Sequence, residues 1–308
     1  MRKQALEKAL KTFLTFEDLG PRQEELEYFF QRYPQVPREV ILKEDLLRLG
    51  FTFSEAALQA SAGCRLKSYR MFSYDRVKLT QMGNQEGLKV PEDITIQGGI
   101  YGLRPLIVRV QVSPNSPYQI DVREDRLVLL ADGLTVAEVA YPPAPAYYSR
   151  CFEDGTPYYQ VVPMVGGGRI PIVTASRYCQ HWGVGEQCQF CDISETAREL
   201  AKLGKAALAR TYKKVEQVVQ VMETIFQEEK DLPTNPRCFT ITGGTITGDL
   251  QGLDDTHFYL QYVEAVRERI GREWRGALST EAKPRRDLET FRAAGVDVHM
   301  ANIEVWEP

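Results

Sequence analysis

The residues best suited to chemistry lie in one stretch, residues 177–193, which reads RYCQHWGVGEQCQFCDI. This stretch holds Cys179, Cys188 and Cys191, whereas the other three cysteines of the chain occur singly. Thiolates are soft, negatively charged ligands, and three of them on one short segment suit an iron–sulfur cluster or zinc. The first residues do not read as a secretory signal, so we expect bound metal rather than disulfide bridges.

The spacing Cys179-x8-Cys188-x2-Cys191 resembles the cluster motif of the radical S-adenosylmethionine (SAM) superfamily. That motif usually has gaps of x3 and x2 and an aromatic residue directly before the last cysteine, where this chain has Phe190. The first gap is longer here, as in some variants of the family. The resemblance implies that the three cysteines bind a 4Fe-4S cluster whose fourth iron takes an outside ligand, and that Phe190 packs near the adenine of SAM.

A structural zinc site is the main alternative interpretation of the same residues. Cys179, His181, Cys188 and Cys191 have the donor types of a Cys3His zinc knuckle, in which a paired C-x2-C is joined by a further cysteine and a histidine. Such a site stabilises a loop and predicts nothing about later strands of the chain.

The composition is that of an ordinary globular protein, with 43% hydrophobic and 26% charged residues in a chain of 308. A net charge of -4 argues against nucleic acid as the main partner. No apolar run approaches the length of a membrane span. The first sixteen residues are basic and amphipathic, and Leu6, Leu10, Phe13 and Leu14 form the stripe of a packed helix. We therefore expect a cytoplasmic protein that does not bind membranes.

The N-terminal half predicts an α+β region, with helices followed by a small antiparallel sheet. Residues 1–90 read as helical: Pro21 opens one helix, residues 38–49 form the next before Gly50, and residues 54–62 form another. Residues 91–168 alternate with a period of two, and Asp132-Gly133 predicts a hairpin turn. We place a domain boundary at the glycine run 166–168.

From residue 169 to 308 the pattern alternates between apolar strands and amphipathic helices. Strands are expected at residues 170–175, 238–242, 274–280 and 296–306, with helices between them. Repeated βα units indicate an α/β fold with a parallel sheet, and in barrels the chemistry lies at the carboxyl ends of the strands. The cysteine segment follows the first of these ends. The resemblance implies a partial TIM-like radical SAM barrel, comprising the first four of the family's six βα units.

Other strand ends carry further candidate cofactor-binding residues. Gly243-Gly244-Thr245 resembles the GGE motif that binds the methionine end of SAM in the family, with threonine in place of glutamate. Asn302 and Glu304 resemble the fourth-strand element that holds the SAM ribose in biotin-synthase-like and lipoyl-synthase-like enzymes. Glu281 follows the third strand, where it suits a ribose or amine ligand or a helix cap. Of the basic residues after it, Arg285 and Arg286 could hold a carboxylate, and Lys283 and both arginines also suit a solvated surface.

The resemblance implies a radical SAM enzyme that reductively cleaves SAM to a 5'-deoxyadenosyl radical, which abstracts hydrogen from an unidentified small-molecule or peptide substrate. Its cofactors would be the 4Fe-4S cluster and SAM, and its partner an electron donor such as flavodoxin or ferredoxin. No second cysteine cluster is evident, which disfavours sulfur insertion. The competing classes are a non-catalytic zinc or iron–sulfur module and an accessory subunit completed by another chain.

Overall fold

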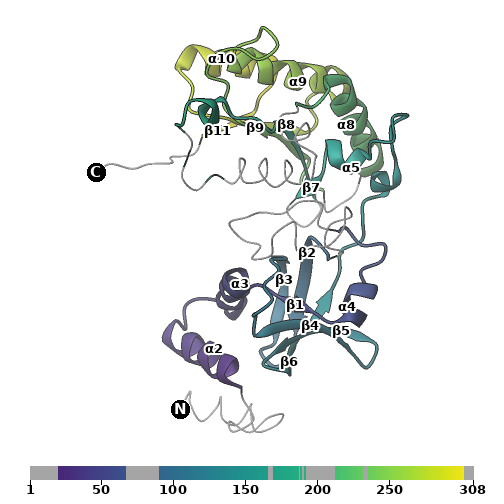
Figure 1. Ribbon diagram of the computed structural model, residues 1–308, viewed down its shortest axis with the longest axis vertical. Coiled ribbons are helices and arrows are strands. Elements are labelled where there is room, and N and C mark those ends of the chain that lie inside the picture. Colours follow the sequence, from purple (N-terminus) through teal and green to yellow (C-terminus); the bar gives the residue numbers. More distant parts are fainter. Residues whose placement is uncertain are drawn as a thin grey trace. The chain divides into compact units, whose positions relative to one another are not determined.

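The structure, a computed structural model, describes residues 20–66, 90–165, 169–186, 188, 191, 212–231 and 235–301. The chain divides into two compact units, Met1–Ala144 and Pro145–Pro308, which are described separately below (Figure 1). The division falls within the proline-rich segment 142–148. The expected first helix, Phe190, Asn302 and Glu304 lie outside the described residues.

The first unit begins with helices α2 (Pro21–Arg32), α3 (Arg38–Leu49) and α4 (Glu55–Gln59). Pro21 occupies the first position of α2, where its missing N–H costs nothing, as predicted. The prediction for α3 is also confirmed: it ends at Gly50, whose φ of +73° suits glycine. The Ser54 side chain caps α4, which is shorter than predicted.

A six-stranded sheet completes this unit, in the order β1-β4-β5-β6-β2-β3. Its strands are β1 (Thr52–Phe53), β2 (Asp93–Gly98), β3 (Leu103–Arg109), β4 (Tyr118–Arg123), β5 (Arg126–Ala131) and β6 (Leu134–Ala140). All neighbours pair antiparallel except β1 with β4. The predicted hairpin at Asp132-Gly133 is confirmed, with positive φ at both residues. Helices and sheet share one core, in which Leu26 and Leu42 pack with Ile94 and Ile120.

The second unit is a five-stranded sheet with helices beside it. Its elements are η3 (Ala146–Ser149), α5 (Tyr158–Val161), β7 (Met164–Val165), β8 (Ile170–Ser176), η4 (Gln180–Gly183), α8 (Val215–Glu229), β9 (Cys238–Gly243), α9 (Asp255–Ile270), β10 (Arg275–Ser279), α10 (Arg285–Ala294) and β11 (Val298–Met300). The strand order is β11-β10-β9-β8-β7. Strands β8 to β11 are parallel, as predicted, and β7 is antiparallel to β8.

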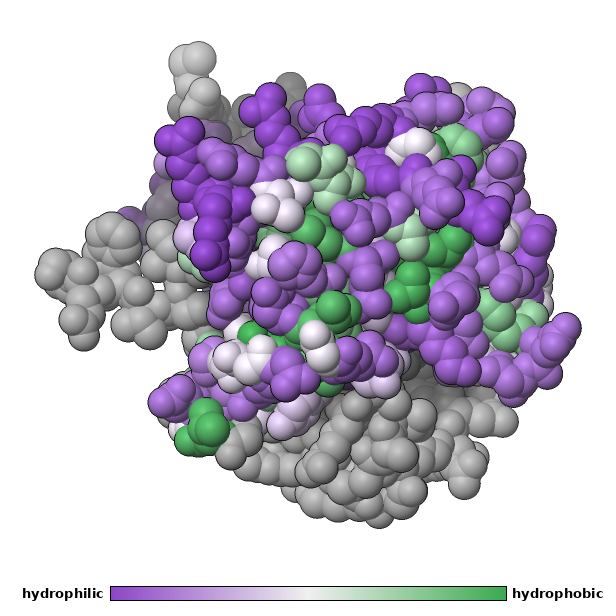
Figure 2. Space-filling model, turned by 90° about the horizontal axis from the view of Figure 1, so that it is seen from above, coloured by the Kyte–Doolittle hydropathy of each residue, from purple (hydrophilic) through white to green (hydrophobic). Residues whose placement is uncertain are grey.

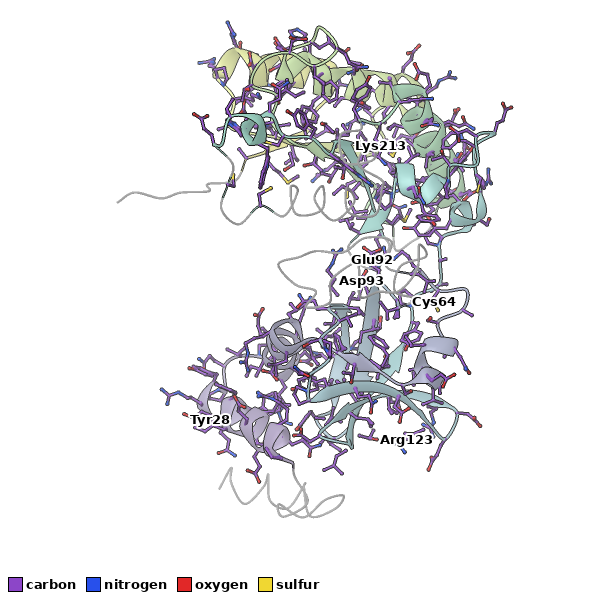
Figure 3. The ribbon with its side chains drawn as sticks, viewed as in Figure 1. Tyr28, Cys64, Glu92, Asp93, Arg123 and Lys213 are labelled. Carbon is purple, nitrogen blue, oxygen red and sulfur yellow. The ribbon has the colours of Figure 1, made fainter. Side chains whose placement is uncertain are left out.

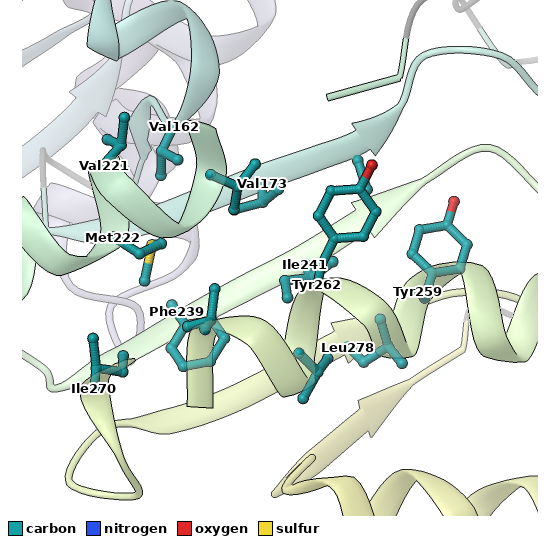
Figure 4. Close-up of a cluster of buried hydrophobic side chains, with 14 of the residues drawn as sticks. Val162, Val173, Val221, Met222, Phe239, Ile241, Tyr259, Tyr262, Ile270 and Leu278 are labelled. Atoms are coloured by element: carbon teal, nitrogen blue, oxygen red, sulfur yellow. The ribbon is translucent and has the colours of Figure 1, made fainter. Parts of the chain in front are cut away.

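The parallel strands carry their apolar side chains on the face covered by α8, α9 and α10 (Figure 1). Phe239, Ile241 and Leu278 are buried there among side chains of α8 and α9, including Met222 and Tyr262 (Figure 4). The outward surface of this helical layer is mostly hydrophilic, with small separate apolar groups (Figure 2). The described strands form an open sheet rather than a closed barrel, since β7 and β11 are its edges. Among the helices described, none has the length and apolar character needed to cross a membrane.

A buried arginine fixes the end of this sheet opposite to the cysteine segment. Nη1 of Arg267 donates to the carbonyls of Gly271 and Trp274, at 2.9 and 2.6 Å. Its Nε donates to the Gly295 carbonyl at 2.9 Å, and its Nη2 pairs with Asp297 at 2.6 Å. Every nitrogen of the guanidinium therefore has a partner, which is what a buried cation requires.

Candidate metal and cofactor site

The cysteine segment begins with a tight turn at the carboxyl end of β8. Ser176 is buried, and its hydroxyl both accepts from the Tyr178 N–H at 3.1 Å and donates to the Tyr178 carbonyl at 2.9 Å. This serine turn directs the chain into η4, with Cys179 as the residue before the helix. The first predicted metal ligand is thus held directly at the end of a buried strand.

The main chain of two glycines at the end of β9, Gly243 and Gly244, lies against this turn. A Cβ on Gly244 would lie 2.4 Å from the Tyr178 carbonyl oxygen and 2.7 Å from Cα of Cys179. A Cβ on Gly243 would lie 2.4 Å from Oη of Tyr259 and 2.8 Å from the Ser176 carbonyl oxygen. Such distances exclude any side chain, so glycine is required here for close approach. The Gly244 N–H donates to the Ser176 carbonyl at 3.1 Å.

Tyr259 holds the Gly-Gly turn from the side of α9. Its hydroxyl donates to the Gly244 carbonyl at 2.7 Å, and its ring is fully buried. Burial, and secondly the negative charge of Asp255, raise the pKa of Tyr259. The phenol therefore stays protonated and remains a hydrogen-bond donor to the turn.

Gln180 fastens the cysteine segment to the loop that follows β9. Its backbone N–H donates to the Thr245 carbonyl at 2.8 Å, and its side-chain Nε2 donates to the Asp249 carbonyl at 2.9 Å. The side-chain oxygen accepts from the Gly248 N–H and the Thr247 hydroxyl, at 2.8 and 3.3 Å. This role of Gln180 could not be predicted, because a single glutamine in a loop belongs to no recognisable motif.

A third loop, after β10, is held to the carboxyl end of the parallel sheet by a buried ion pair. Nζ of Lys283 lies 2.7 Å from Oδ2 of Asp255 and 2.8 Å from Oε1 of Glu281. Oδ1 of Asp255 accepts from the Ile246 N–H at 2.8 Å. Asp255 at the start of α9 therefore links the loop after β9 to the loop after β10.

The basic residues after β10 differ in exposure. Lys283 is only 5% exposed, so the interpretation of this lysine as solvated surface is wrong, whereas Arg285 and Arg286 are 92% and 87% exposed. Burial alone would lower the pKa of Lys283, but hydrogen bonds and charges of Asp255 and Glu281 outweigh it and raise that pKa. Glu281 does not cap α10, which begins without a side-chain cap. Its carboxylate is 42% exposed.

His299 on β11 contacts the loop after β10 at the same end of the sheet. Its Nε2 lies 3.1 Å from the Thr280 hydroxyl, and its ring packs 5.4 Å from that of Phe291. Burial and the nearby charge of Lys283 lower the pKa of His299, although the Glu281 backbone and Asp255 act in the opposite direction. The neutral imidazole thus holds the loop after β10 against β11. Sequence analysis had not singled out His299.

Within the described part of the chain, Cys179, Cys188 and Cys191 are not joined in disulfides. Cys179 and Cys191 are half-buried and Cys188 is exposed, and the Cys191 N–H donates to the Cys188 carbonyl at 3.1 Å. Nδ1 of His181 lies 3.7 Å from a carboxylate oxygen of Glu186. Within the described ranges, no three or more side chains of histidine, cysteine, aspartate or glutamate are arranged around a common point that would hold a metal ion.

The sheet face away from the helices is polar near this edge. Cross-strand pairing aligns Thr174 with Thr242 and Thr242 with Ser279, near the carboxyl ends of β8, β9 and β10. All three are half-exposed, in contrast to the buried Val173, Ile241 and Leu278 that alternate with them. Hydroxyl groups therefore line the sheet directly below Cys179 and the Gly-Gly turn.

The structure thus brings the following residues, from three separate loops, to the carboxyl end of the parallel sheet: Cys179, Gly243, Gly244, Thr245 and Glu281. Parallel strands place their carboxyl ends together, which is where ligands bind in α/β proteins. Comparison of the chain with protein-family models, curated proteins and solved structures found no match.

Proposed function

We propose that this chain is a radical SAM enzyme, which binds a 4Fe-4S cluster through Cys179, Cys188 and Cys191 and cleaves SAM reductively. One observation carries the proposal: the main chain of Gly244 packs directly against that of Cys179. A Cβ on Gly244 would lie only 2.7 Å from Cα of Cys179. The cysteine motif and the Gly-Gly motif, about sixty residues apart in the chain, were assigned to one cofactor by resemblance. They therefore meet at the carboxyl ends of neighbouring strands. A zinc knuckle gives no reason for this contact.

The residues present fit an iron–sulfur cluster by their donor chemistry. Three thiols free of disulfides lie on one loop, and thiolates are the ligands that such clusters take. Cys188 is exposed and Cys179 and Cys191 are half-exposed, so iron and sulfide have access to them. When bound, the cluster supplies one electron for the cleavage of the SAM sulfonium bond.

The protein would contribute binding, orientation and exclusion of water around that chemistry. The backbone of Gly243 and Gly244 is the proposed contact for the methionine end of SAM, because this turn resembles the GGE motif. Thr245 takes part through its main chain, whose carbonyl accepts from Gln180. Glu281, with its carboxylate held on one side by Lys283, is the proposed acceptor for ribose or amine hydrogens. Phe190, Asn302 and Glu304 stay predicted contacts.

We further propose that the parallel sheet of the second unit is the first part of a TIM-like radical SAM barrel. The order β8-β9-β10-β11, with all four strands parallel and their helices on one face, is the order of successive βα units in such a barrel. The hydroxyl-lined face of Thr174, Thr242 and Ser279 would then look into the barrel, where a substrate meets the radical.

The test is anaerobic reconstitution of the full chain with iron and sulfide, followed by reduction, addition of SAM and chromatographic measurement of 5'-deoxyadenosine. The variant Cys179→Ala/Cys188→Ala/Cys191→Ala removes the proposed ligands. Its matched control, Cys64→Ala/Cys151→Ala/Cys238→Ala, removes the same number of thiols elsewhere. We expect 5'-deoxyadenosine from the wild type and the control, and none from the first variant.

Metal analysis separates the alternatives. A colourless protein with one tightly bound zinc and no SAM cleavage would establish the structural zinc site and overturn the proposal. A brown protein with a cluster that leaves SAM intact under reduction would favour the non-catalytic iron–sulfur module or the accessory subunit. Electron paramagnetic resonance of the reduced cluster, with and without SAM, tells whether SAM reaches the open iron.

A further inference from the structure

Arg177 and Lys213 lie together beside the cysteine segment, and neither has an acidic partner among the described residues. Ser176 at the end of β8 forms an isolated antiparallel bridge with Tyr212, and the Lys213 N–H donates to the Ala175 carbonyl at 2.8 Å. In antiparallel pairing, residues two apart across a bridge share a face and lie within reach of long side chains. This pairing brings Lys213 close to Arg177 (Figure 3 labels Lys213).

Neither cation is neutralised within the described part of the chain. Nζ of Lys213 donates to the backbone carbonyl of Gln160, which uses one of its three hydrogens. The charge of Arg177 acts on Lys213, and no carboxylate contributes to the pKa shift of either residue. Burial, and secondly the charge of Arg177, lower the pKa of Lys213 to about 7. Two like charges that lie close together repel each other, and partial burial strengthens that repulsion.

Arg177 and Lys213 differ in this respect from the buried basic residues Lys283 and Arg267 of the same unit. Lys283 is buried between two carboxylates, and Arg267 is satisfied by three carbonyls and Asp297. Arg177 is exposed and Lys213 half-exposed, so both remain open to a dissolved molecule. A planar guanidinium and a compact ammonium side by side are the groups that hold a phosphate or carboxylate.

We propose that Arg177 and Lys213 form a binding site for an anionic group, phosphate or carboxylate, of a small molecule. The anion relieves the repulsion between the two cations and takes up the hydrogens of Lys213 and Arg177 that have no acceptor in the described chain. The site itself needs neither iron nor SAM. If the proposed function holds, the site deepens it, because Arg177 stands two residues before Cys179 and the anionic group then belongs to a molecule bound next to the cluster.

The first experiment titrates the full chain, without iron or SAM, with inorganic phosphate, pyrophosphate and malonate at neutral pH and low salt in a calorimeter. We expect saturable binding of at least one of them. Arg177→Met and Lys213→Met should each weaken it by about tenfold or more, as expected for losing a charge-assisted hydrogen bond. The controls Arg169→Met, at the other end of β8, and Lys214→Met, next to Lys213, should change it by less than about twofold.

Absence of saturable binding by all three anions would overturn the proposal, as would an equal loss in the control variants. A second measurement covers a variant that folds poorly: in the wild type, the ε-carbon resonance of Lys213 should report a higher pKa when the anion is bound. An unchanged resonance at saturation would place the anion elsewhere. After reconstitution, displacement of the anion by SAM identifies its source as the SAM carboxylate, whereas simultaneous binding identifies a charged substrate.

Discussion

The side-chain oxygen of Gln180 accepts a hydrogen bond from the backbone N–H of Gly248 at a distance of 2.8 Å, across 68 positions of the chain. A residue directly after the first predicted cluster ligand therefore fixes the loop that follows β9. The loop carries the Gly-Gly turn at its start, so one side chain helps to fix both the position of Cys179 and the position of the turn.

Gln180→Met keeps the size of this side chain and removes its hydrogen bonds. We expect faster amide hydrogen exchange at Gly248 and Asp249, and, under the proposed function, an increase of about tenfold in the KM for SAM with little loss of bound iron. Hydrogen exchange with mass spectrometry and 5'-deoxyadenosine kinetics measure the two effects. Gln227→Met, an exposed position on α8, is the control. Unchanged exchange at residues 247–249 would show that Gln180 does not hold the loop.

Gly244→Ala should disrupt the site, because its Cβ would lie 2.4 Å from the Tyr178 carbonyl and 2.7 Å from Cα of Cys179. The main chain of the cysteine segment has to move by several tenths of an ångström, and we expect the iron content after reconstitution to fall by more than half. Gly248→Ala is a matched control in the same loop, since its nearest neighbour would be a flexible side-chain atom at 3.7 Å. Equal iron content in the two variants would contradict the contact.

Arg267→Met should destabilise the second unit by about 3 kcal/mol or more in the free energy of unfolding, because it leaves Asp297 and three carbonyls without their donor. Urea unfolding followed by tryptophan fluorescence measures the effect, since Trp274 is buried next to this arginine. Arg269→Met, exposed on the same helix, should cost less than about 0.5 kcal/mol. Similar losses in both variants would mean that the guanidinium network contributes little.

Glu229 at the end of α8 makes a pH-dependent contribution. Burial, and secondly the charge of Glu228, raise its pKa from 4.5 to about 7. The folded state thus disfavours the ionised form, and the resulting cost is absent below about pH 4.5, grows between pH 4.5 and 7, and is complete above pH 7. Glu229→Gln should therefore be more stable than the wild type at about pH 8, on the order of 1 kcal/mol, with the difference vanishing toward pH 4.

Urea unfolding at several pH values checks this prediction, with Glu223→Gln on the same helix as the control. A difference between Glu229→Gln and the wild type that stays constant with pH, or that grows on acidification, would contradict the assignment. The sign is opposite to that of a carboxylate in an ion pair, which loses its stabilising effect as the pH falls.

Elements with a local chemical signal could be predicted from the sequence. Pro21 opens α2, Gly50 ends α3 with a positive φ, and Asp132-Gly133 forms the hairpin turn, because each of these residues restricts or permits its own backbone angles. The parallel strands of the second unit were predicted for a similar reason, since their apolar runs are short and separated by helical patterns.

Contacts between distant segments could not be predicted in the same way. The run Lys283, Pro284, Arg285, Arg286 reads as solvated surface, yet Lys283 is buried because Asp255 on another helix supplies its counter-charge. The role of Gln180 depends on a loop 68 positions later, and the pairing of Arg177 with Lys213 depends on a bridge between Ser176 and Tyr212. Each of these side chains acquires its partner only after the sheet has formed.

The two sheets differ in how far apart their neighbouring strands lie along the chain, and this has a consequence for how the protein is made. In the second unit every strand pairs with the next in sequence, so its sheet can grow stepwise as the chain leaves the ribosome. In the first unit β1 pairs with β4 and β2 with β6. Thr52 and Phe53 must wait for residues 119 and 120, and β2, which pairs early with β3, must wait for β6 to cover its other side. Translation pauses within the first unit therefore prolong the exposure of unpaired strand edges.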